Sequence, residues 1–398
     1  MVARVAPRGA RVLARKKQVL TALPEVLIFV DWYLPGYRAG GPIQSVASLV
    51  THLPCRFSIV TSCFDHATST PYPGIATDQW IERAPNERVI YLSKRPSVKQ
   101  LSSILAERAY HRILINSLFS VSFAVLPLFA CRRMGMQTKV ILAPRGMLKP
   151  GALSLKSGKK KTFIALAKTF GWFRGITWLA SSSDERNEIV THFGQASTVV
   201  VAPNLPRKVT IRRSRPKKEA GKLHLYTVAR VSQEKNLLQG IEWLAQTDGC
   251  IRYDIFGTLQ NTDYLAKCQA AAERAAQLDV RFHGDIAPHE IPGKTSQHHF
   301  MFLPTLGENY GHSIAEAIGS GIPVIVSDQT PWRNLHSDQL GWDLPLAADR
   351  MLPVLLHCLE MDDDLYTELC QGTETNGPKR THNEAALRAN LKLFCETP

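Results

Sequence analysis

Two glutamates, Glu308 and Glu316, are spaced so that both side chains can face the same ligand. They lie in HFMFLPTLGENYGHSIAEAIGSGIPVIVSD, residues 299–328, where we expect a strand ending at Leu303 and a helix beginning near Tyr310. Their separation is about two helical turns, so Glu316 can point toward the turn that holds Glu308. The helix N-terminus offers free backbone N–H groups to a phosphate, and the carboxylates can accept hydrogen bonds from a sugar ring and a ribose. Without the surrounding turn and strands, this spacing would be better interpreted as a solvated helix face.

Two cations follow the first strand predicted in the same half of the chain. In LHLYTVARVSQEKNLLQGIEWL, Arg230 and Lys235 lie on a loop between that strand and a helix. Arginine binds phosphate oxygens through its planar fork and lysine binds them as a point charge, so the pair suits a diphosphate. Either residue alone would be equally typical of a surface cation.

A pair of glycines follows the first predicted strand of the whole chain. Gly40 and Gly41 stand in LPGYRAGGPIQSVASLV, directly before a predicted helix. Because glycine has no side chain, the backbone there can approach a ligand closely. A Gly-Gly pair by itself often marks only a turn.

The elements that must position these residues are short apolar strands alternating with helix-like stretches, a pattern typical of a parallel sheet covered by helices. The predicted strands are 26–30, 57–61, 89–92, 112–115, 140–143 and 177–180 in the first half, and 223–228, 252–256, 280–283, 299–303 and 323–326 in the second. The expected fold class is therefore α/β, with two Rossmann-like, doubly wound domains facing each other across a cleft. Open α/β sheets bind ligands at the carboxyl ends of their strands.

A segment rich in proline and charge divides the chain. Residues 206–222 contain few large apolar side chains and are interpreted as an interdomain linker. The N-terminal domain is then 1–205, with a basic arm at 1–22. The C-terminal domain is 223–398, and its last helix can pack back on the N-terminal domain.

The charge of the chain is unevenly distributed. The net charge is +14 overall, and residues 1–205 alone carry 27 Lys and Arg against 10 Asp and Glu. This half is expected to meet an anionic partner, either a phosphate-bearing substrate or a membrane surface. Nucleic acid is the least favoured partner, since no zinc spacing or helix-turn-helix signal accompanies the charge. The eight cysteines are scattered without a C-x-x-C pair, which favours a reducing cytosol over a disulfide framework or a zinc site.

Two further segments raise the question of a membrane. Residues 113–131 are uncharged and about long enough to cross a bilayer, but their polar residues and proline favour a buried strand leading into a buried helix. The segment KSGKKKTFIALAKTFGWFR, from Lys156 to Arg174, mixes basic and aromatic side chains. Such a helix suits an anionic membrane surface, and the alternative is a core-packed helix with a solvated basic face.

The three motifs together resemble glycosyltransferase family four, a group within the GT-B fold whose bacterial members include exopolysaccharide and capsule enzymes. That family combines an N-terminal Gly-Gly loop with an R-x4-K pair and an E-x7-E motif, here Gly40–Gly41, Arg230 with Lys235, and Glu308 with Glu316. The similarity runs from about residue 26 to 348.

The resemblance implies a role for each matched residue. Arg230, Lys235 and Glu308 would be catalytic: the two cations would neutralise the leaving diphosphate, and Glu308 would bind the transferred sugar. The remaining donor contacts would come from the residues Gly40, Gly41, Gly257, Asn309, Tyr310, Gly311, His312, Ser313 and Glu316, the last of which would hold the ribose. The family retains anomeric configuration and needs no metal ion or other cofactor. One departure is Arg145, which stands where many members have a histidine.

The expected function is transfer of a hexose-type sugar from a nucleotide-diphosphate sugar, held by the C-terminal domain, to a glycan or polyprenyl-linked acceptor on the N-terminal side. The enzyme would act in the cytoplasm on cell-surface polysaccharide, in peripheral contact with the inner face of the membrane. The alternatives are a non-catalytic nucleotide- or glycan-binding protein on the same scaffold and a GT-B nucleotide-sugar epimerase. The sequence leaves open which sugar, base, acceptor and linkage are used.

Overall fold

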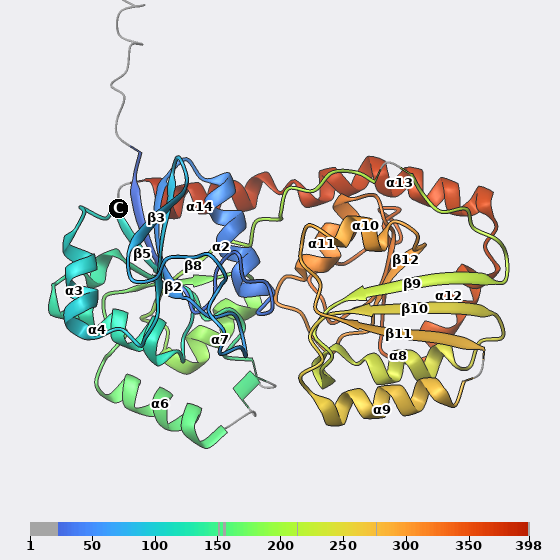
Figure 1. Ribbon diagram of the computed structural model, residues 1–398, viewed down its shortest axis with the longest axis horizontal. Coiled ribbons are helices and arrows are strands. Elements are labelled where there is room, and N and C mark those ends of the chain that lie inside the picture. The colour runs from blue at the N-terminus through green and yellow to red at the C-terminus, as the bar shows by residue number, and fades with distance from the viewer. Residues whose placement is uncertain (1–22, 150–151, 154–156, 213, 276, 397–398) are drawn as a thin grey trace, which may run out of the picture.

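The computed structural model describes residues 23–149, 152–153, 157–212, 214–275 and 277–396. The predicted basic arm, 1–22, lies outside the described residues, as does Lys156 of the basic aromatic segment. Two α/β domains stand side by side, each built around one twisted sheet (Figure 1).

The N-terminal sheet has eight strands in the order β3-β4-β2-β1-β5-β6-β7-β8, and all neighbours are parallel except β3 and β4. The strands are β1 (Glu25–Phe29), β2 (Arg56–Ser62), β3 (Trp80–Ala84), β4 (Glu87–Leu92), β5 (Arg112–Ile115), β6 (Val140–Leu142), β7 (Thr177–Ala180) and β8 (Thr198–Val201). The helices are α2 (Gly41–His52), α3 (Val98–Ala106), α4 (Leu126–Arg133), α6 (Ser157–Thr169) and α7 (Ser183–Phe193), with short turns η2 (Val121–Val125) and η3 (Gln137–Lys139). Alternate residues of β1 enter the cores on opposite faces of this sheet, which explains its continuous apolar sequence.

The C-terminal sheet has six parallel strands in the order β11-β10-β9-β12-β13-β14. They are β9 (Lys222–Val228), β10 (Cys250–Phe256), β11 (Leu278–Gly284), β12 (Phe300–Leu303), β13 (Val324–Ser327) and β14 (Gly341–Leu344). The helices of this domain are α8 (Leu237–Leu244), α9 (Thr262–Glu273), α10 (Ile291–Thr295), α11 (His312–Gly319), α12 (Ala348–Glu360) and α13 (Asp363–Thr381), with a turn η4 (Gln233–Lys235); α13 is followed by α14 (Glu384–Cys395).

Both strand orders reverse direction at one point, between β1 and β5 in the first sheet and between β9 and β12 in the second. Such reversal is the mark of a doubly wound sheet, and the crevice beside it is where such sheets bind ligands. The α/β class with two Rossmann-like domains, predicted from the alternation of strands and helices, is thus confirmed.

The stretch 113–131 is a buried part of the N-terminal domain. It forms β5, η2 and α4, and most of its side chains belong to the core. The prediction of a buried strand and helix is confirmed. No helix in the described ranges is both long and apolar enough to span a bilayer.

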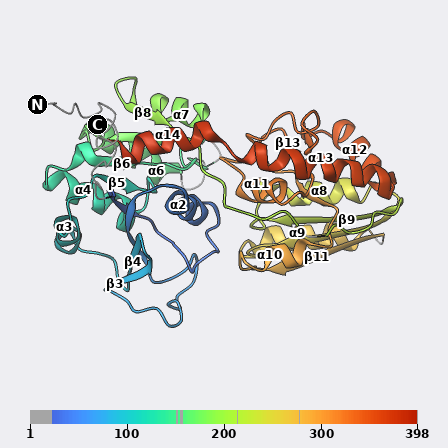
Figure 2. The ribbon, with the colours of Figure 1, turned by 90° about the horizontal axis from the view of Figure 1, so that it is seen from above.

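The chain crosses between the domains twice. The segment between β8 and β9, interpreted as a linker, is held against the C-terminal domain: Lys218 Nζ donates to the backbone oxygens of Leu359 and Met361, both at 2.9 Å. After α13 the chain returns, and α14 lies on the N-terminal domain (Figures 1 and 2). There Leu393 and Phe394 join the core that covers one face of the N-terminal sheet.

Candidate functional site

A cavity of about 310 Å³ lies between the two domains and has walls from both. Its C-terminal wall includes residues that follow β11 and, next to them, the two loops after β9 and β12, the strands that flank the reversal of strand order. These loops carry Arg230 with Lys235 and Glu308 with Glu316, respectively. Although β10 and β11 separate the motifs along the chain, the strand order brings them side by side.

Lys235 and Glu308 form an ion pair inside this cavity. Lys235 Nζ lies 2.6 Å from Glu308 Oε1, and the two side chains are only 11% and 15% exposed. The backbone of Glu308 is fixed independently, because its N–H donates to Gln329 O at 3.2 Å and its carbonyl accepts from Lys149 Nζ at 3.0 Å. The carboxylate therefore has a defined place beside a cation.

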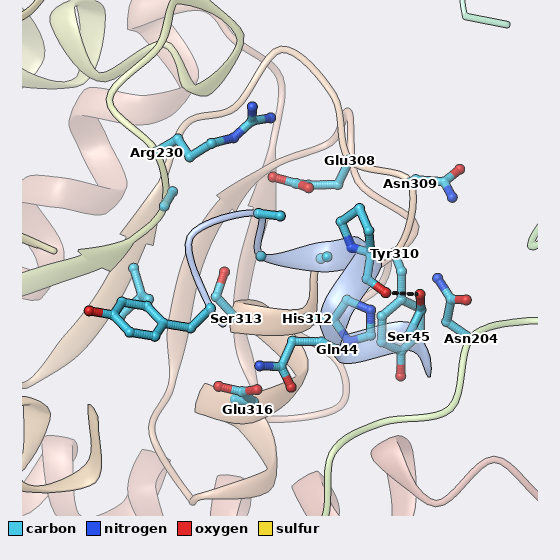
Figure 3. A pocket seen from close by; sticks show the side chains of 18 of the residues that line it. Gln44, Ser45, Asn204, Arg230, Glu308, Asn309, Tyr310, His312, Ser313 and Glu316 are labelled. Atoms are coloured by element: carbon cyan, nitrogen blue, oxygen red, sulfur yellow. Dashed lines mark hydrogen bonds between the residues drawn. The ribbon is translucent and has the colours of Figure 1, made fainter. Parts of the chain in front are cut away.

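Arg230 is held much more loosely than Lys235. Its side chain is 49% exposed, and its ion pair with Glu234 is 3.9 Å long. Figure 3 shows Arg230 and Glu308 on one side of the pocket and Glu316 on the opposite side, with Ser313 between them. The guanidinium is free to turn toward an anion that enters the cavity.

Glu316 lies in α11, the helix that follows the Glu308 loop, and it also lines the cavity. Burial raises the pKa of its carboxyl group, and the Arg207 guanidinium opposes that shift. The two glutamates thus line one cavity, but from opposite sides of it, whereas their spacing had suggested that Glu316 faces the turn that holds Glu308. Helix α11 begins at His312, close to the predicted start near Tyr310.

The residues between the glutamates line the same cavity: Asn309, Tyr310, Gly311, His312 and Ser313. Burial lowers the pKa of His312 to about 3, with a further contribution from Arg145, so its imidazole is neutral at pH 7. Both of its ring nitrogens lack a hydrogen-bond partner among the residues described. A neutral imidazole of this kind can donate one hydrogen bond and accept another.

The Gly40–Gly41 pair forms part of the N-terminal wall. Gly40 has φ 65°, a left-handed conformation that favours glycine, and it caps α2. The wall continues along the first turn of α2 with Gln44 and Ser45. The pair therefore brings the start of α2 against the motif loops, and Gly41 lies beside His312.

Asn309 links the two walls. Its Nδ2 donates to Ser181 Oγ at 2.8 Å, and Ser181 Oγ in turn donates to the buried carboxylate of Glu185 at 2.7 Å. Glu185 also accepts from the backbone N–H of Gly146 at 2.6 Å. A second contact across the cleft is the ion pair of Arg38 with Asp285 at 2.8 Å. The domains are thus joined by polar contacts on both sides of the cavity.

Arg145 also lines the cavity. Its Nε donates to Asn116 Oδ1 at 2.7 Å and its Nη1 to Asn204 Oδ1 at 2.5 Å. It forms no ion pair within the described ranges, and burial lowers the pKa of its guanidinium to about 10. Arg145, at which the sequence departs from the resemblance described above, is therefore a positioned cation in the wall of the cavity.

Gly257, predicted to contact the donor, is not among the residues that line the cavity. It lies at the end of β10 with φ 145°, and a Cβ atom there would meet Ala229 O at 2.0 Å. Its missing side chain allows the backbone of Ala229 and Arg230 to pass close behind it. Gly257 thus supports the Arg230 loop without contacting the cavity.

Several lining residues were not identified from the sequence: Tyr37, Gln44, Ser45, Asn204, Pro288 and Ile291. Gln44 and Ser45 follow Gly41 within one helical turn, so the Gly-Gly motif could have pointed to them. Asn204 follows β8, a strand that was not predicted, and gave no local signal. Among the described residues, no group of three or more His, Cys, Asp or Glu side chains is placed to hold a metal ion.

Comparisons with known proteins agree with this architecture. Residues 209–338 match the family model of glycosyl transferases group 1, and no curated protein sequence matches the chain. Sucrose-phosphate synthase from Thermosynechococcus elongatus is similar in structure, with a TM-score of 0.66, 16% identity, and coverage of 94% of this chain and 98% of that one. Anabaena HepE in complex with UDP and glucose is also similar in structure, with a TM-score of 0.63 and 16% identity. The match covers 93% of this chain and 98% of that one.

WaaG, a glycosyltransferase involved in lipopolysaccharide biosynthesis, is also similar, with a TM-score of 0.61, 11% identity, and coverage of 93% of this chain and 100% of that one. At these identities the likeness shows the fold. The expected GT-B architecture is confirmed, and residues 209–338 are similar to glycosyl transferases group 1.

Proposed function

Starting from the similarity of residues 209–338 to glycosyl transferases group 1, we propose that this protein transfers a hexose-type sugar from a nucleotide-diphosphate sugar to a glycan or lipid-linked acceptor, with retention of anomeric configuration. The observation that carries the proposal is the pairing of Lys235 with Glu308 in a cavity that Arg230 also faces. A sugar diphosphate needs cations for its phosphates and acceptors for its sugar hydroxyls, and this cavity offers both.

Each of these residues then binds a different part of the donor. Arg230 and Lys235 stabilise the negative charge that develops on the diphosphate as its bond to the sugar breaks. Glu308 accepts hydrogen bonds from the transferred sugar, and Glu316, on the opposite side, accepts them from the ribose. The backbone at the start of α11 contributes N–H donors to the phosphates. The two cations supply the positive charge for the diphosphate, so we propose that transfer is independent of metal ions.

The likeness to HepE, whose structure holds UDP and glucose, supports a nucleotide-sugar donor. The likeness to WaaG supports an acceptor destined for the cell surface. We propose that the enzyme works in the cytoplasm, where a polyprenyl-linked acceptor is reached at the inner face of the membrane.

The donor proposal is tested by a thermal-shift screen against UDP, GDP, ADP and their common sugar conjugates. A nucleotide that binds only the folded state, at 100 times its Kd, stabilises that state by about 2.7 kcal/mol. We expect one base to raise the apparent Tm in wild type and in Lys267→Ala, a surface control on α9, and not in Lys235→Ala. If no nucleotide raises the Tm of wild type, the alternative function, a non-catalytic binding protein with the same fold, becomes the better interpretation.

A surface of the N-terminal domain supports the membrane part of the proposal. Of the aromatic side chains in the segment that ends at Arg174, Phe163, Trp172 and Phe173 pack against the core, while Phe170 stands out with 66% of its surface exposed. Four exposed apolar side chains, here called the aromatic surface, lie on η2, α4, α6 and the turn after it: Val121, Phe129, Leu166 and Phe170. Trp172 lies between two of them, 5.3 Å from Phe129 and 6.4 Å from Phe170 by ring centroids.

Exposed basic side chains lie on the same helices as the aromatic surface or next to them in the sequence. Those exposed on α6 and beside it are Lys159, Lys161, Lys168, Arg133 and Arg174. Exposed apolar groups among cations suit the interface of an anionic bilayer, where each basic residue contributes about 1 kcal/mol.

In vesicle flotation we expect wild type to bind phosphatidylglycerol-containing vesicles and to bind neutral phosphatidylcholine vesicles weakly. The double substitution Leu166→Ser with Phe170→Ser should lower binding about tenfold or more, because two side chains lose their apolar burial. Leu365→Ser, at an exposed leucine of α13, is the matched control. Equal binding of wild type to both kinds of vesicle would refute the membrane contact.

A further inference from the structure

Helix α14 is packed against the N-terminal domain. Helix α14 packs with Leu393 and Phe394 into the N-terminal core. Its end is held by Arg112, whose Nε donates to Leu393 O at 3.0 Å, and its middle by Asn390, whose Nδ2 donates to Pro203 O at 2.9 Å. The end of α14 therefore has a defined position on the sheet.

Two thiols meet at this junction. Cys395, the last residue of α14, places its Sγ 3.0 Å from Sγ of Cys55, which precedes β2, and the two residues are 340 positions apart. Cys55 is only 1% exposed, and Cys395 is partly exposed. Of the eight cysteines, all within the described residues, no other pair makes such a contact.

The two thiols differ in their chemistry. The hydrogen bond between the two thiols lowers the pKa of Cys395, whereas the same hydrogen bond, together with burial, raises the pKa of Cys55. Cys395 is thus the thiol that ionises first, and it is also the one that solvent reaches. Thiolate character and access are what make a cysteine reactive toward oxidants, and a neighbouring thiol can resolve the oxidised product.

We propose that Cys55 and Cys395 form a reversible disulfide that fastens α14 to the N-terminal domain when the protein meets a peroxide. The Cys395 thiolate attacks one peroxide oxygen and becomes a sulfenic acid, and water leaves after protonation. The sulfur of Cys55 then attacks the sulfenic sulfur, and the displaced hydroxide takes the Cys55 proton to form a second water. In sum, two thiols and one hydrogen peroxide give one disulfide and two waters.

The disulfide would add a covalent tie to the second crossing between the domains. In the reduced protein α14 is held by apolar packing and hydrogen bonds alone. With the bond formed, α14 stays on the N-terminal domain, and the unfolded chain is closed into a very long loop. Closing a long loop lowers the entropy of the unfolded state and so favours the folded one.

The test is oxidation of the full-length, previously reduced protein with hydrogen peroxide, followed by peptide mapping under non-reducing conditions. Wild type should yield one cross-linked peptide pair containing Cys55 and Cys395, with the loss of two hydrogens, and dithiothreitol should reverse it. The oxidised form should melt about 5–10 °C higher than the reduced form. Cys250→Ser, which removes an exposed cysteine outside the junction, should behave as wild type.

Cys395→Ser should lose both the cross-link and the gain in Tm, and this variant changes a partly exposed residue, so it is expected to fold. Oxidation of wild type to a sulfinic acid at Cys395 without a cross-link would overturn the proposal. So would a cross-link between other cysteines, no reaction at all, or a Tm that oxidation does not raise. None of these readouts depends on glycosyl transfer, so they stand or fall separately from the proposed function.

Discussion

Glu308→Gln is expected to lower the turnover of sugar transfer by about 10²–10³-fold, the loss that follows removal of one transition-state hydrogen bond in other active sites. The amide has the size of the carboxylate but no negative charge to accept strong hydrogen bonds from the sugar. Because the backbone of Glu308 is held by Gln329 and Lys149, and the amide oxygen can still accept from Lys235, the fold should stay intact. The measurement is product formation with the nucleotide sugar identified by thermal shift.

The matched control is Glu242→Gln, which removes a carboxylate from the exposed side of α8, away from the cavity. It should keep wild-type turnover. Glu308→Ala should be at least as inactive as Glu308→Gln, and it also leaves Lys235 without its partner. Wild-type turnover in Glu308→Gln, in a protein that melts normally, would remove Glu308 from the catalytic machinery.

Lys235→Ala is expected to lower kcat/KM by about 10²–10³-fold, and Arg230→Ala by about tenfold. The difference follows from their surroundings. Lys235 is 11% exposed and fixed against Glu308, so its charge acts in a place from which water is largely excluded. Arg230 is 49% exposed, and water screens its charge and can partly replace it. Steady-state kinetics over a range of donor concentrations separates the two effects.

Lys267→Ala serves as the control for lost positive charge, since Lys267 is an exposed lysine of α9. Equal losses in Lys235→Ala and Lys267→Ala would point to a general effect of net charge. If Arg230→Ala were the more damaging of the two cavity variants, the diphosphate would have to lie nearer the exposed rim than this cavity suggests.

The elements that carry the motifs were predictable from the sequence because they are buried and central. The strands β9 and β12 appeared as short apolar runs, 223–228 and 299–303, and the loops after them hold Arg230 and Glu308. The strands that were missed, β3, β8 and β14, all lie at sheet edges. Edge strands bury fewer side chains, so WIERA and GWDL show little of the apolar pattern by which strands are recognised. The sequence of β8, TVVV, does have that pattern, and this short strand of four residues was overlooked.

Residue types and their spacing were also enough to identify the two charged motifs, Arg230 with Lys235 and Glu308 with Glu316. Each motif lies within one short segment of the chain, so it can be recognised without knowing the fold. Only the tertiary structure decided what the motifs face. The ion pair of Lys235 with Glu308 depends on the adjacency of β9 and β12. The contact of Asn309 with Ser181, the place of Arg145 in the wall, and the meeting of Cys55 with Cys395 depend on packing between segments far apart in the chain. A local pattern records the propensity of its own segment, whereas such contacts arise from the whole arrangement of strands, helices and domains.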